Sequence, residues 1–183
     1  AVEAAKAAGW TDIKCIEIAG VQGDATNTAR MEGYREGVNE AGGEFLDAET
    51  QYANATADLA VTAMEGIMSK YPEGVAIICS NNDDMALGAI NALSNAGYNL
   101  AGGEGCTVIP VFGVDATDAA KELIANKQMT GSIKQDAEGM ADAVATITAN
   151  LIEGKDKFEG LNENYEVVDG WTVNIPYSVY TGE

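Results

Sequence analysis

The stretch Val75–Ala92, with the sequence VAIICSNNDDMALGAINA, decides the fold class of this chain. It opens with five apolar residues in a row, Val75–Cys79, which is typical of a central strand in a parallel sheet. Polar residues follow at once in Ser80–Asp84, and a helix is expected from Asp83 to Ala96. A buried strand, a polar turn and a helix in this order form the repeating unit of an α/β protein.

The same alternation extends in both directions from this stretch. Apolar, β-branched runs predict strands, and apolar residues at helical spacing predict helices. The strands are expected at Ile13–Ile18, Glu44–Asp47, Val75–Cys79, Thr107–Val114, Thr130–Ile133 and Trp171–Tyr180, and the helices at Ala1–Ala8, Thr28–Ala41, Thr56–Lys70, Asp83–Ala96, Thr117–Asn126 and Asp136–Glu153. The prediction is a doubly wound α/β fold with a parallel sheet, which binds ligands at the carboxyl ends of its strands.

Composition and charge exclude several classes of protein. The chain has 183 residues, 29 acidic and 10 basic, so its formal net charge is −19. Scattered basic residues provide no face for phosphates, and nucleic acid is not an expected partner. Histidine is absent, which removes the Ser-His and Cys-His nucleophile pairs and most zinc sites. The longest apolar runs are too short to span a bilayer. We therefore expect neither an enzyme nor a metal or other cofactor.

The three cysteines, Cys15, Cys79 and Cys106, are widely spaced and form no CxxC pair. Cys15 and Cys79 lie in apolar, strand-like runs, so we expect buried thiols that pack as small apolar side chains. A disulfide or a reactive thiol is the alternative.

Polar side chains follow four of the expected strands, at the edge of the sheet where a ligand would bind. They are Asp24, Arg30, Asn82, Asp115 and Gln135. Carboxylate, amide and guanidinium groups form paired hydrogen bonds with neighbouring hydroxyls, which suits a neutral polyol. The alternative is that the Asp and Asn residues serve only as helix caps and turn formers. Arg30 and Gln135 are not preferred in that role.

Four stretches resemble the bacterial type I periplasmic sugar-binding proteins, especially the galactose/glucose and ribose receptors. They are Gly20–Tyr34 (GVQGDATNTARMEGY), Ile77–Ala92 (IICSNNDDMALGAINA), Pro110–Thr117 (PVFGVDAT) and Gly131–Asp136 (GSIKQD). The resemblance runs in order over nearly the whole chain. Members of this family clamp a sugar between two similar lobes, and the ligand-binding cores of LacI-type repressors share the same plan.

The resemblance implies that the first lobe is largely missing from this chain, which is interpreted as a C-terminal portion. Residues 1–133 correspond to the C-terminal ligand-binding lobe, residues 134–168 to a crossover segment whose helix packs on the first lobe, and residues 169–183 to a strand that returns to the C-terminal lobe. Helix 136–153 has an apolar stripe of Met140, Val144, Ile147 and Leu151. Because burial of such a stripe is favourable, we expect it to fold back on its own lobe or to form a homodimer.

The resemblance also assigns ligand-binding roles to particular residues. Arg30, Asn82 and Asp115 match the arginine, the amide and the carboxylate that bind sugar hydroxyls in the family. Asp24 stands where the galactose/glucose receptors have a histidine. Gln135 replaces an asparagine with a longer side chain of the same chemistry.

The aromatic residue that stacks on the sugar in the family is not clearly matched. Direct alignment places Ala55 at its position, and Tyr52 lies three residues earlier. Either Tyr52 supplies the apolar platform, or the pocket lacks one. The calcium loop of the galactose receptor has no counterpart in Gly9–Lys14, so the expectation of no cofactor includes calcium.

The resulting hypothesis is a solute-binding protein that delivers a monosaccharide, such as galactose, glucose or ribose, to an ABC transporter. The implied partners are the sugar and the transporter permease, and a chemoreceptor is left open. The implied location is periplasmic or extracellular, with a lipid anchor in a Gram-positive organism. The ligand-binding core of a LacI-type regulator is the alternative, and a doubly wound enzyme is a third reading that the missing histidine disfavours.

Overall fold

The computed structural model describes residues 1–182 and divides into two compact units. The first unit comprises Ala1–Ile133 together with the C-terminal residues from Tyr180, and the second comprises Lys134–Val179. The first unit contains most of the sheet and five of the helices.

A seven-stranded sheet runs through the first unit in the order β2-β1-β4-β5-β6-β9, and β3 also pairs with β1. Its strands are β1 (Lys14–Ala19), β2 (Glu44–Phe45), β3 (Gln51–Tyr52), β4 (Ile77–Ser80), β5 (Val111–Val114), β6 (Gly131–Lys134) and β9 (Ser178–Tyr180). β1 is parallel to β2, β3 and β4, and the pairs β4–β5 and β5–β6 are parallel as well. This topology confirms the predicted doubly wound α/β fold.

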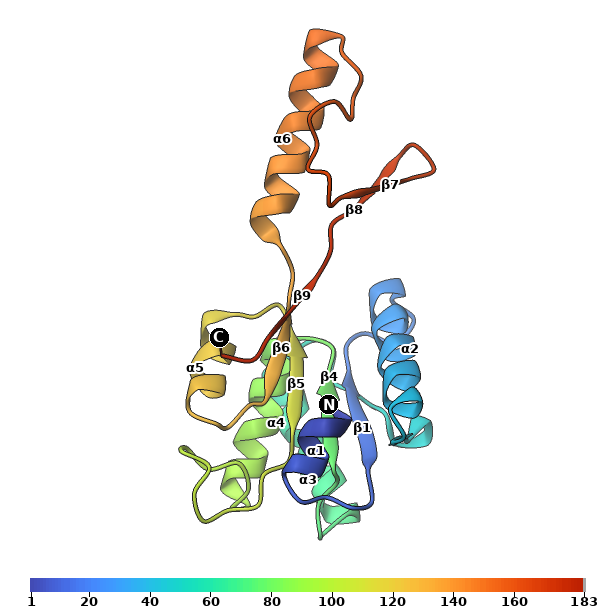
Figure 1. The fold of residues 1–183 in the computed structure, drawn as a ribbon. Coiled ribbons are helices and arrows are strands. Elements are labelled where there is room, and N and C mark those ends of the chain that lie inside the picture. The colour runs from blue at the N-terminus through green and yellow to red at the C-terminus, as the bar shows by residue number, and fades with distance from the viewer. Residues whose placement is uncertain (183) are drawn as a thin grey trace. The chain divides into compact units, whose positions relative to one another are not determined.

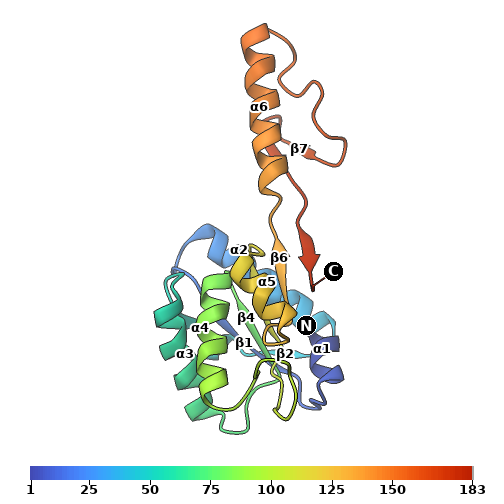
Figure 2. The same ribbon diagram turned by 90° about the vertical axis from the view of Figure 1, so that its left-hand side faces the viewer.

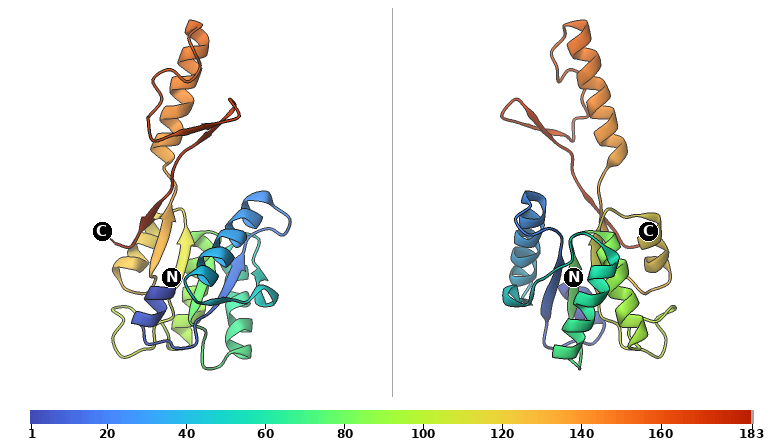
Figure 3. Two further views of the ribbon diagram at one scale, coloured as in Figure 1. Left: turned by 45° about the vertical axis from the view of Figure 1, so that its right-hand side comes forward. Right: turned by 180° about the vertical axis from the view of Figure 1, so that it is seen from behind.

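Helices cover both faces of this sheet (Figures 1 and 3). α1 (Val2–Ala7) and α2 (Ala25–Glu40) pack on one side, which we call the α2 face. α3 (Ala57–Lys70), α4 (Asp83–Asn95) and α5 (Asp118–Ala125) pack on the other, which we call the α4 face. A short 3₁₀ turn, η1 (Asp47–Glu49), lies between β2 and β3. Because side chains alternate along a strand, neighbouring residues of β1 and β4 belong to different faces.

α3 and α4 approach each other closely, and a glycine allows this contact. A Cβ atom on Gly88 would collide with the backbone oxygen of Ala57 and the side chain of Ala60. Any larger residue at this position would push α3 and α4 apart. The small residue Gly88 therefore sets the distance between these two helices.

Among the elements of the first unit, the starts of α2 and β5 differ most from the sequence-based prediction. α2 begins at Ala25 and not at Thr28, because the Asp24 carboxylate caps it by accepting the backbone N–H of Asn27 at 2.9 Å. β5 begins at Val111 and not at Thr107. Pro110, which has no N–H, immediately precedes the strand and contributes only its carbonyl, to the N–H of Ile78 at 2.9 Å.

The second unit consists of α6 (Ala137–Glu153) and a two-stranded antiparallel hairpin of β7 (Glu166–Val168) and β8 (Thr172–Asn174). After α6 the chain turns back along the helix (Figure 2). Asn150 anchors this return, because its buried side-chain N–H donates to the carbonyl of Glu159 at 2.7 Å. No helix within residues 1–182 has the length and apolar character needed to cross a membrane.

The hairpin corrects the prediction of one continuous extended segment over Trp171–Tyr180. Asp169 and Gly170 both have positive φ and form a tight turn, closed by the N–H of Trp171, which donates to the carbonyl of Val168 at 3.2 Å. The extended chain is also interrupted after Asn174 and resumes only in β9.

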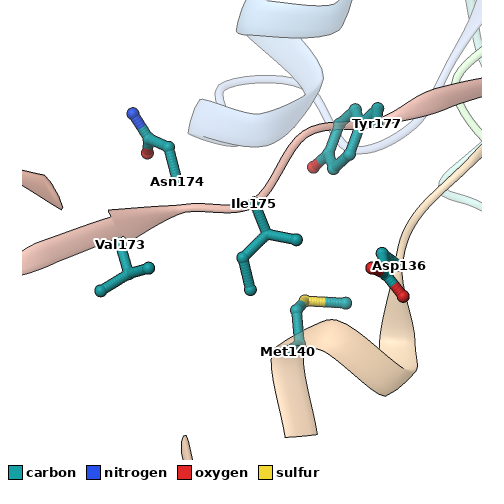
Figure 4. Close-up of a pocket in the computed structure, with 6 residues that line it drawn as sticks. All are labelled: Asp136, Met140, Val173, Asn174, Ile175 and Tyr177. Carbon is teal, nitrogen blue, oxygen red and sulfur yellow. The ribbon is translucent and has the colours of Figure 1, made fainter. Parts of the chain in front are cut away.

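The apolar stripe of α6 is largely exposed in this chain. The exposed fractions of Met140, Val144 and Leu151 are 40%, 65% and 61%. Close to the start of the helix, a cavity of about 380 Å³ opens between α6, the hairpin strand β8 and the segment that follows β8. Val173, Ile175 and Met140 supply its apolar wall, as Figure 4 shows.

Candidate ligand-binding site

A small pocket lies in the first unit at the carboxyl ends of β1 and β4, which we call the strand-end pocket. Its polar lining residues are Asp24, Thr26, Asn27, Arg30, Asn81 and Asn82, and the others are Gly20, Val21, Ala55 and Met85. Its volume is about 130 Å³, whereas pockets for small ligands usually have about 300–1,000 Å³. The strand-end pocket is therefore large enough for one side of a small ligand and too small to enclose it.

The N-terminus of α2 positions one wall of this pocket. The cap formed by Asp24 fixes where the helix begins, and Asn27 and Arg30 follow at a spacing of three residues. Residues three apart lie on the same side of a helix, so both side chains face the end of β4. Asp24 itself is exposed and lines the same wall.

A buried hydrogen-bond network joins the two strand ends. The Asn27 side-chain oxygen accepts the backbone N–H of Gly20 and the side-chain N–H of Asn81. Arg30 donates to the backbone oxygen of Asn81. Asn27 and Asn81 are buried, and sequence reasoning missed both. The available signal was that Asn81 and Asn82 both follow the buried strand β4 directly, and both line the pocket.

Asn82 has two roles in the structure. Its side-chain oxygen caps α4 by accepting the N–H of Met85 at 2.9 Å, and its side-chain nitrogen donates to the carbonyl of Ala55 at 3.4 Å. Asn82 is therefore both a helix cap and a residue of the pocket wall. The two roles that the sequence offered as alternatives are compatible for this side chain.

Asp115 lies at the end of β5, on the same edge of the sheet but outside the lining of the strand-end pocket. Its φ is 117° and that of Ala116 is 53°, values that are strained for residues with a Cβ. The structure holds this turn through backbone bonds: the N–H of Asp115 donates to Ile133, and the N–H of Ala116 donates to the Ser132 hydroxyl. Such strain is found preferentially at functional sites.

Neighbouring Asp83 has a structural role and does not line the pocket. Its carboxylate accepts the Ser132 hydroxyl and the backbone N–H of Thr117, both at 2.7 Å. Burial raises the pKa of Asp83, and these two hydrogen bonds oppose the rise. Within residues 1–182 no cluster of three or more Cys, Asp or Glu residues is arranged to hold a metal ion.

Besides Asp115, two more predicted site residues lie outside the lining of this pocket. Tyr52 is exposed on β3 and is not among the lining residues, whereas Ala55 is. No aromatic side chain occurs among the residues found to line the strand-end pocket. Gln135 belongs to the second unit, where its side-chain oxygen accepts the hydroxyl of Tyr177 at 3.4 Å.

Cys15 and Cys79 are buried thiols, as expected from the sequence. Cys15 and Cys79 are fully buried on the α2 face, and the Cys15 thiol donates to the Cys79 sulfur at 3.6 Å. The contact with Cys79 and burial together raise the pKa of Cys15, so it is an unreactive thiol. Cys106 is half-buried and is not in a disulfide.

Comparison with known proteins identifies the class. The family model for the periplasmic binding protein domain matches residues 1–156. Among curated proteins, the D-galactose/methyl-galactoside binding periplasmic protein MglB of Haemophilus influenzae is 35% identical over 111 residues, which cover 61% of this chain and 30% of that protein. The ribose import binding protein RbsB of Escherichia coli is 26% identical over 147 residues, which cover 78% and 46%.

Solved structures show the same fold. A periplasmic solute-binding protein of an ABC transporter from Actinobacillus succinogenes, solved with bound D-allose, superimposes with a TM-score of 0.76 at 22% identity. The superposition covers 98% of this chain and 55% of that one. The chain belongs to the periplasmic binding protein domain family, and its predicted likeness to the type I sugar-binding proteins is confirmed. It spans less than half the length of the curated relatives named above.

Proposed function

We propose that this chain is the C-terminal ligand-binding lobe of a solute-binding protein that holds a monosaccharide for an ABC transporter. One observation carries the proposal: polar side chains from the ends of two neighbouring parallel strands converge on one pocket, in a chain of this family. Carboxylate, amide and guanidinium groups together recognise vicinal hydroxyls. The relatives whose names mention galactose and ribose support a sugar.

The protein binds its ligand and does not transform it. Arg30, Asn82 and Asp24 present donors and acceptors from one side, and Asp115 adds a carboxylate from the next strand end. Gln135 and Tyr52 are further ligand contacts once the complete pocket has formed. Closure of two lobes around the sugar then creates the surface that the permease recognises. This role places the protein in the periplasm or at the outer surface of the cell.

The small volume of the strand-end pocket supports a site that a second lobe completes. We assign residues 1–133 to the C-terminal lobe, residues 134–168 to the crossover and residues 169–183 to the return strand. A first lobe would supply the other half of the site and would cover the exposed apolar stripe of α6. A homodimer through α6 is the competing arrangement, and analytical ultracentrifugation of the chain at several concentrations would reveal it.

The test is a thermal-shift screen of the protein, joined to its first lobe, against D-galactose, D-glucose and D-ribose. Ligand at a hundred times its Kd should stabilise the folded state by about 3 kcal/mol. We expect Asp115→Ala and Arg30→Ala to abolish the shift. Asp118→Ala is the matched control, because Asp118 is exposed on α5. Cooperative unfolding without a shift for any sugar would contradict the proposal.

The ligand-binding core of a transcriptional regulator is the second candidate function. The HTH-type transcriptional regulator CelR of Thermobifida fusca is 29% identical over 138 residues, 75% of this chain and 38% of that protein. Specific DNA binding by the complete protein, relieved by a sugar, would favour this candidate over transport.

A further inference from the structure

Glu17 is a fully buried carboxyl group in the middle of β1. Its exposed fraction is 0%, and it lies on the α2 face, opposite Cys79 in the neighbouring strand. Within residues 1–182 neither of its carboxyl oxygens has a hydrogen-bond partner. Burial of a carboxylate without partners is strongly unfavourable. Glu17 must therefore either be protonated or gain a hydrogen-bond donor in the folded protein.

The surroundings of Glu17 do not neutralise a negative charge. The charge of Arg35 on α2 acts on Glu17, but the guanidinium of Arg35 is paired with the Asp47 carboxylate at 2.5 Å. Burial raises the pKa of Glu17 to about 7. The charge of Arg35 and a contact with the Asn81 side chain, which favours the ionised carboxylate, oppose the rise, and the charge of Asp47 adds to it. The titratable and charged groups on this face are Arg30, Tyr34 and Arg35 from α2, Cys15 from β1, Cys79 from β4 and Asp47 from η1.

A second buried acceptor without a partner lies on the same face. The side-chain oxygen of Asn81 has none, whereas its nitrogen donates to the backbone and side-chain oxygens of Asn27. The orientation of this amide is fixed, because the Asn27 side-chain oxygen already accepts the N–H of Gly20 and requires donors. Within the described part of the chain, two oxygens of Glu17 and one of Asn81 are thus buried acceptors without a partner. The hydroxyl of Thr50, one residue before the β3 residue that pairs with Ile18, is a further buried polar group without a partner among the described residues.

We propose that Glu17 is a positioning residue for the strand-end pocket: it stays protonated in the folded protein and donates its proton to the side-chain oxygen of Asn81. This bond extends the chain of hydrogen bonds from Asn81 through Asn27 to Gly20. It holds the backbone oxygen of Asn81 in place for Arg30. The protonation of Glu17 and the hydrogen bonds from Asn81 to Gly20 are properties of the first unit alone. Only the effect of these bonds on ligand binding rests on the proposed function.

The competing arrangement has an ionised Glu17 that accepts the second N–H of Asn81. The two arrangements predict opposite responses to pH. If Glu17 keeps its proton in the folded state, the unfolded chain, with the ordinary pKa of 4.5, loses that proton first. The folded state then loses stability as the pH rises from about 4.5 to about 7. If Glu17 is stabilised as a carboxylate, stability rises with pH in the acidic range.

The first experiment measures the unfolding equilibrium of the chain in urea, from about pH 5 to about pH 8. Relative to Glu17→Gln, the wild-type folding equilibrium constant should fall about a hundredfold over this range. Glu65→Gln, an exposed carboxyl on α3, should follow the wild-type profile and serves as the control. Identical profiles for wild type and Glu17→Gln, or a wild-type gain with pH, would overturn the proposal.

The second experiment tests positioning without any ligand. Hydrogen exchange of the Gly20 amide, which Asn27 holds, is compared at each pH between wild type and two variants. Wild type should lose protection above about pH 7, whereas Glu17→Gln, whose amide can also donate to Asn81, should keep it. Glu17→Leu, which has no donor, should show low protection at every pH. Equal protection of Gly20 in wild type and Glu17→Gln at high pH would refute the positioning role, and a failure of all sugars to bind would leave both experiments unaffected.

Discussion

The two faces of the sheet in the first unit are built differently. Ile16, Ile18 and Ile78 bury aliphatic side chains on the α4 face. On the α2 face the same two strands present Cys15, Glu17 and Cys79 beside the apolar Ile77, and Asn81 follows β4 directly. Side-chain alternation places both sets on one pair of strands, so the chain has one aliphatic face and one face in which apolar residues surround buried titratable groups.

This difference separates stability from site construction. The α4 face excludes water and contributes most of the hydrophobic stabilisation. The α2 face gives up part of that stabilisation, because buried polar groups contribute little even when they are paired. In return, α2 is joined to the end of β4 by Arg30, by Asn27 and by the Tyr34 hydroxyl, which donates to the carbonyl of Ser80 at 2.9 Å.

Leu93→Ala should have the largest effect on stability. Leu93 lies on α4 and is fully buried in the apolar core of the α4 face. Truncation of such a residue usually costs about 2–5 kcal/mol. Leu151→Ala is the control, because Leu151 is 61% exposed in the second unit. Urea unfolding followed by circular dichroism measures both. A loss of stability in Leu151→Ala as large as in Leu93→Ala would show that α6 is covered in solution.

Asn27→Ala should have an intermediate effect, through the α2 face. The substitution leaves the N–H of Gly20 without its acceptor, and the side-chain nitrogen of Asn81 keeps only the Asn27 backbone oxygen at 3.4 Å. One unpaired buried polar group costs about 1–3 kcal/mol. Asn91→Ala, at an exposed position of α4, should be nearly neutral. If Asn27→Ala is also neutral, the polar network of the α2 face is not formed in solution.

Thr117→Ala should have the smallest effect. The Thr117 hydroxyl oxygen caps α5 by accepting the N–H of Ala120 at 3.2 Å, and loss of such a cap costs about 1 kcal/mol. Thr56 is also an N-cap residue but makes no side-chain cap bond with α3. Thr56→Ala should therefore be less destabilising than Thr117→Ala when both are measured by thermal unfolding, and the reverse order would contradict the capping geometry.

The order of strands and helices was largely predictable, and the exceptions have local causes. The sequence-based prediction begins α2 at Thr28, three residues late, although Asp24 is of a residue type that is strongly preferred at the N-cap. The hairpin of the second unit was missed although Asp169-Gly170 is a strong turn signal. The turn lies between short strands whose alternation is too weak to detect.

The candidate site was predictable only in part. Asp24, Arg30 and Asn82 line the strand-end pocket, as expected of polar residues that follow parallel strands. Asn27 and Asn81 were not selected, because their burial depends on the contact between α2 and the end of β4. The choice between Tyr52 and Ala55 depended on a loop in which Asn54 and Ala55 have positive φ, and loop conformation has no periodic signal.

The sequence by itself determined the alternation of buried strands and helices, because that pattern follows from side-chain periodicity along the chain. It also determined which polar residues lie at the strand ends. Only the tertiary structure decided that Glu17 is buried. An acidic residue between two isoleucines in a strand is normally directed to solvent, and only the packing of α2 over that face of the sheet removed Glu17 from water. Burial is a property of what covers a residue, and the covering helix comes from elsewhere in the chain.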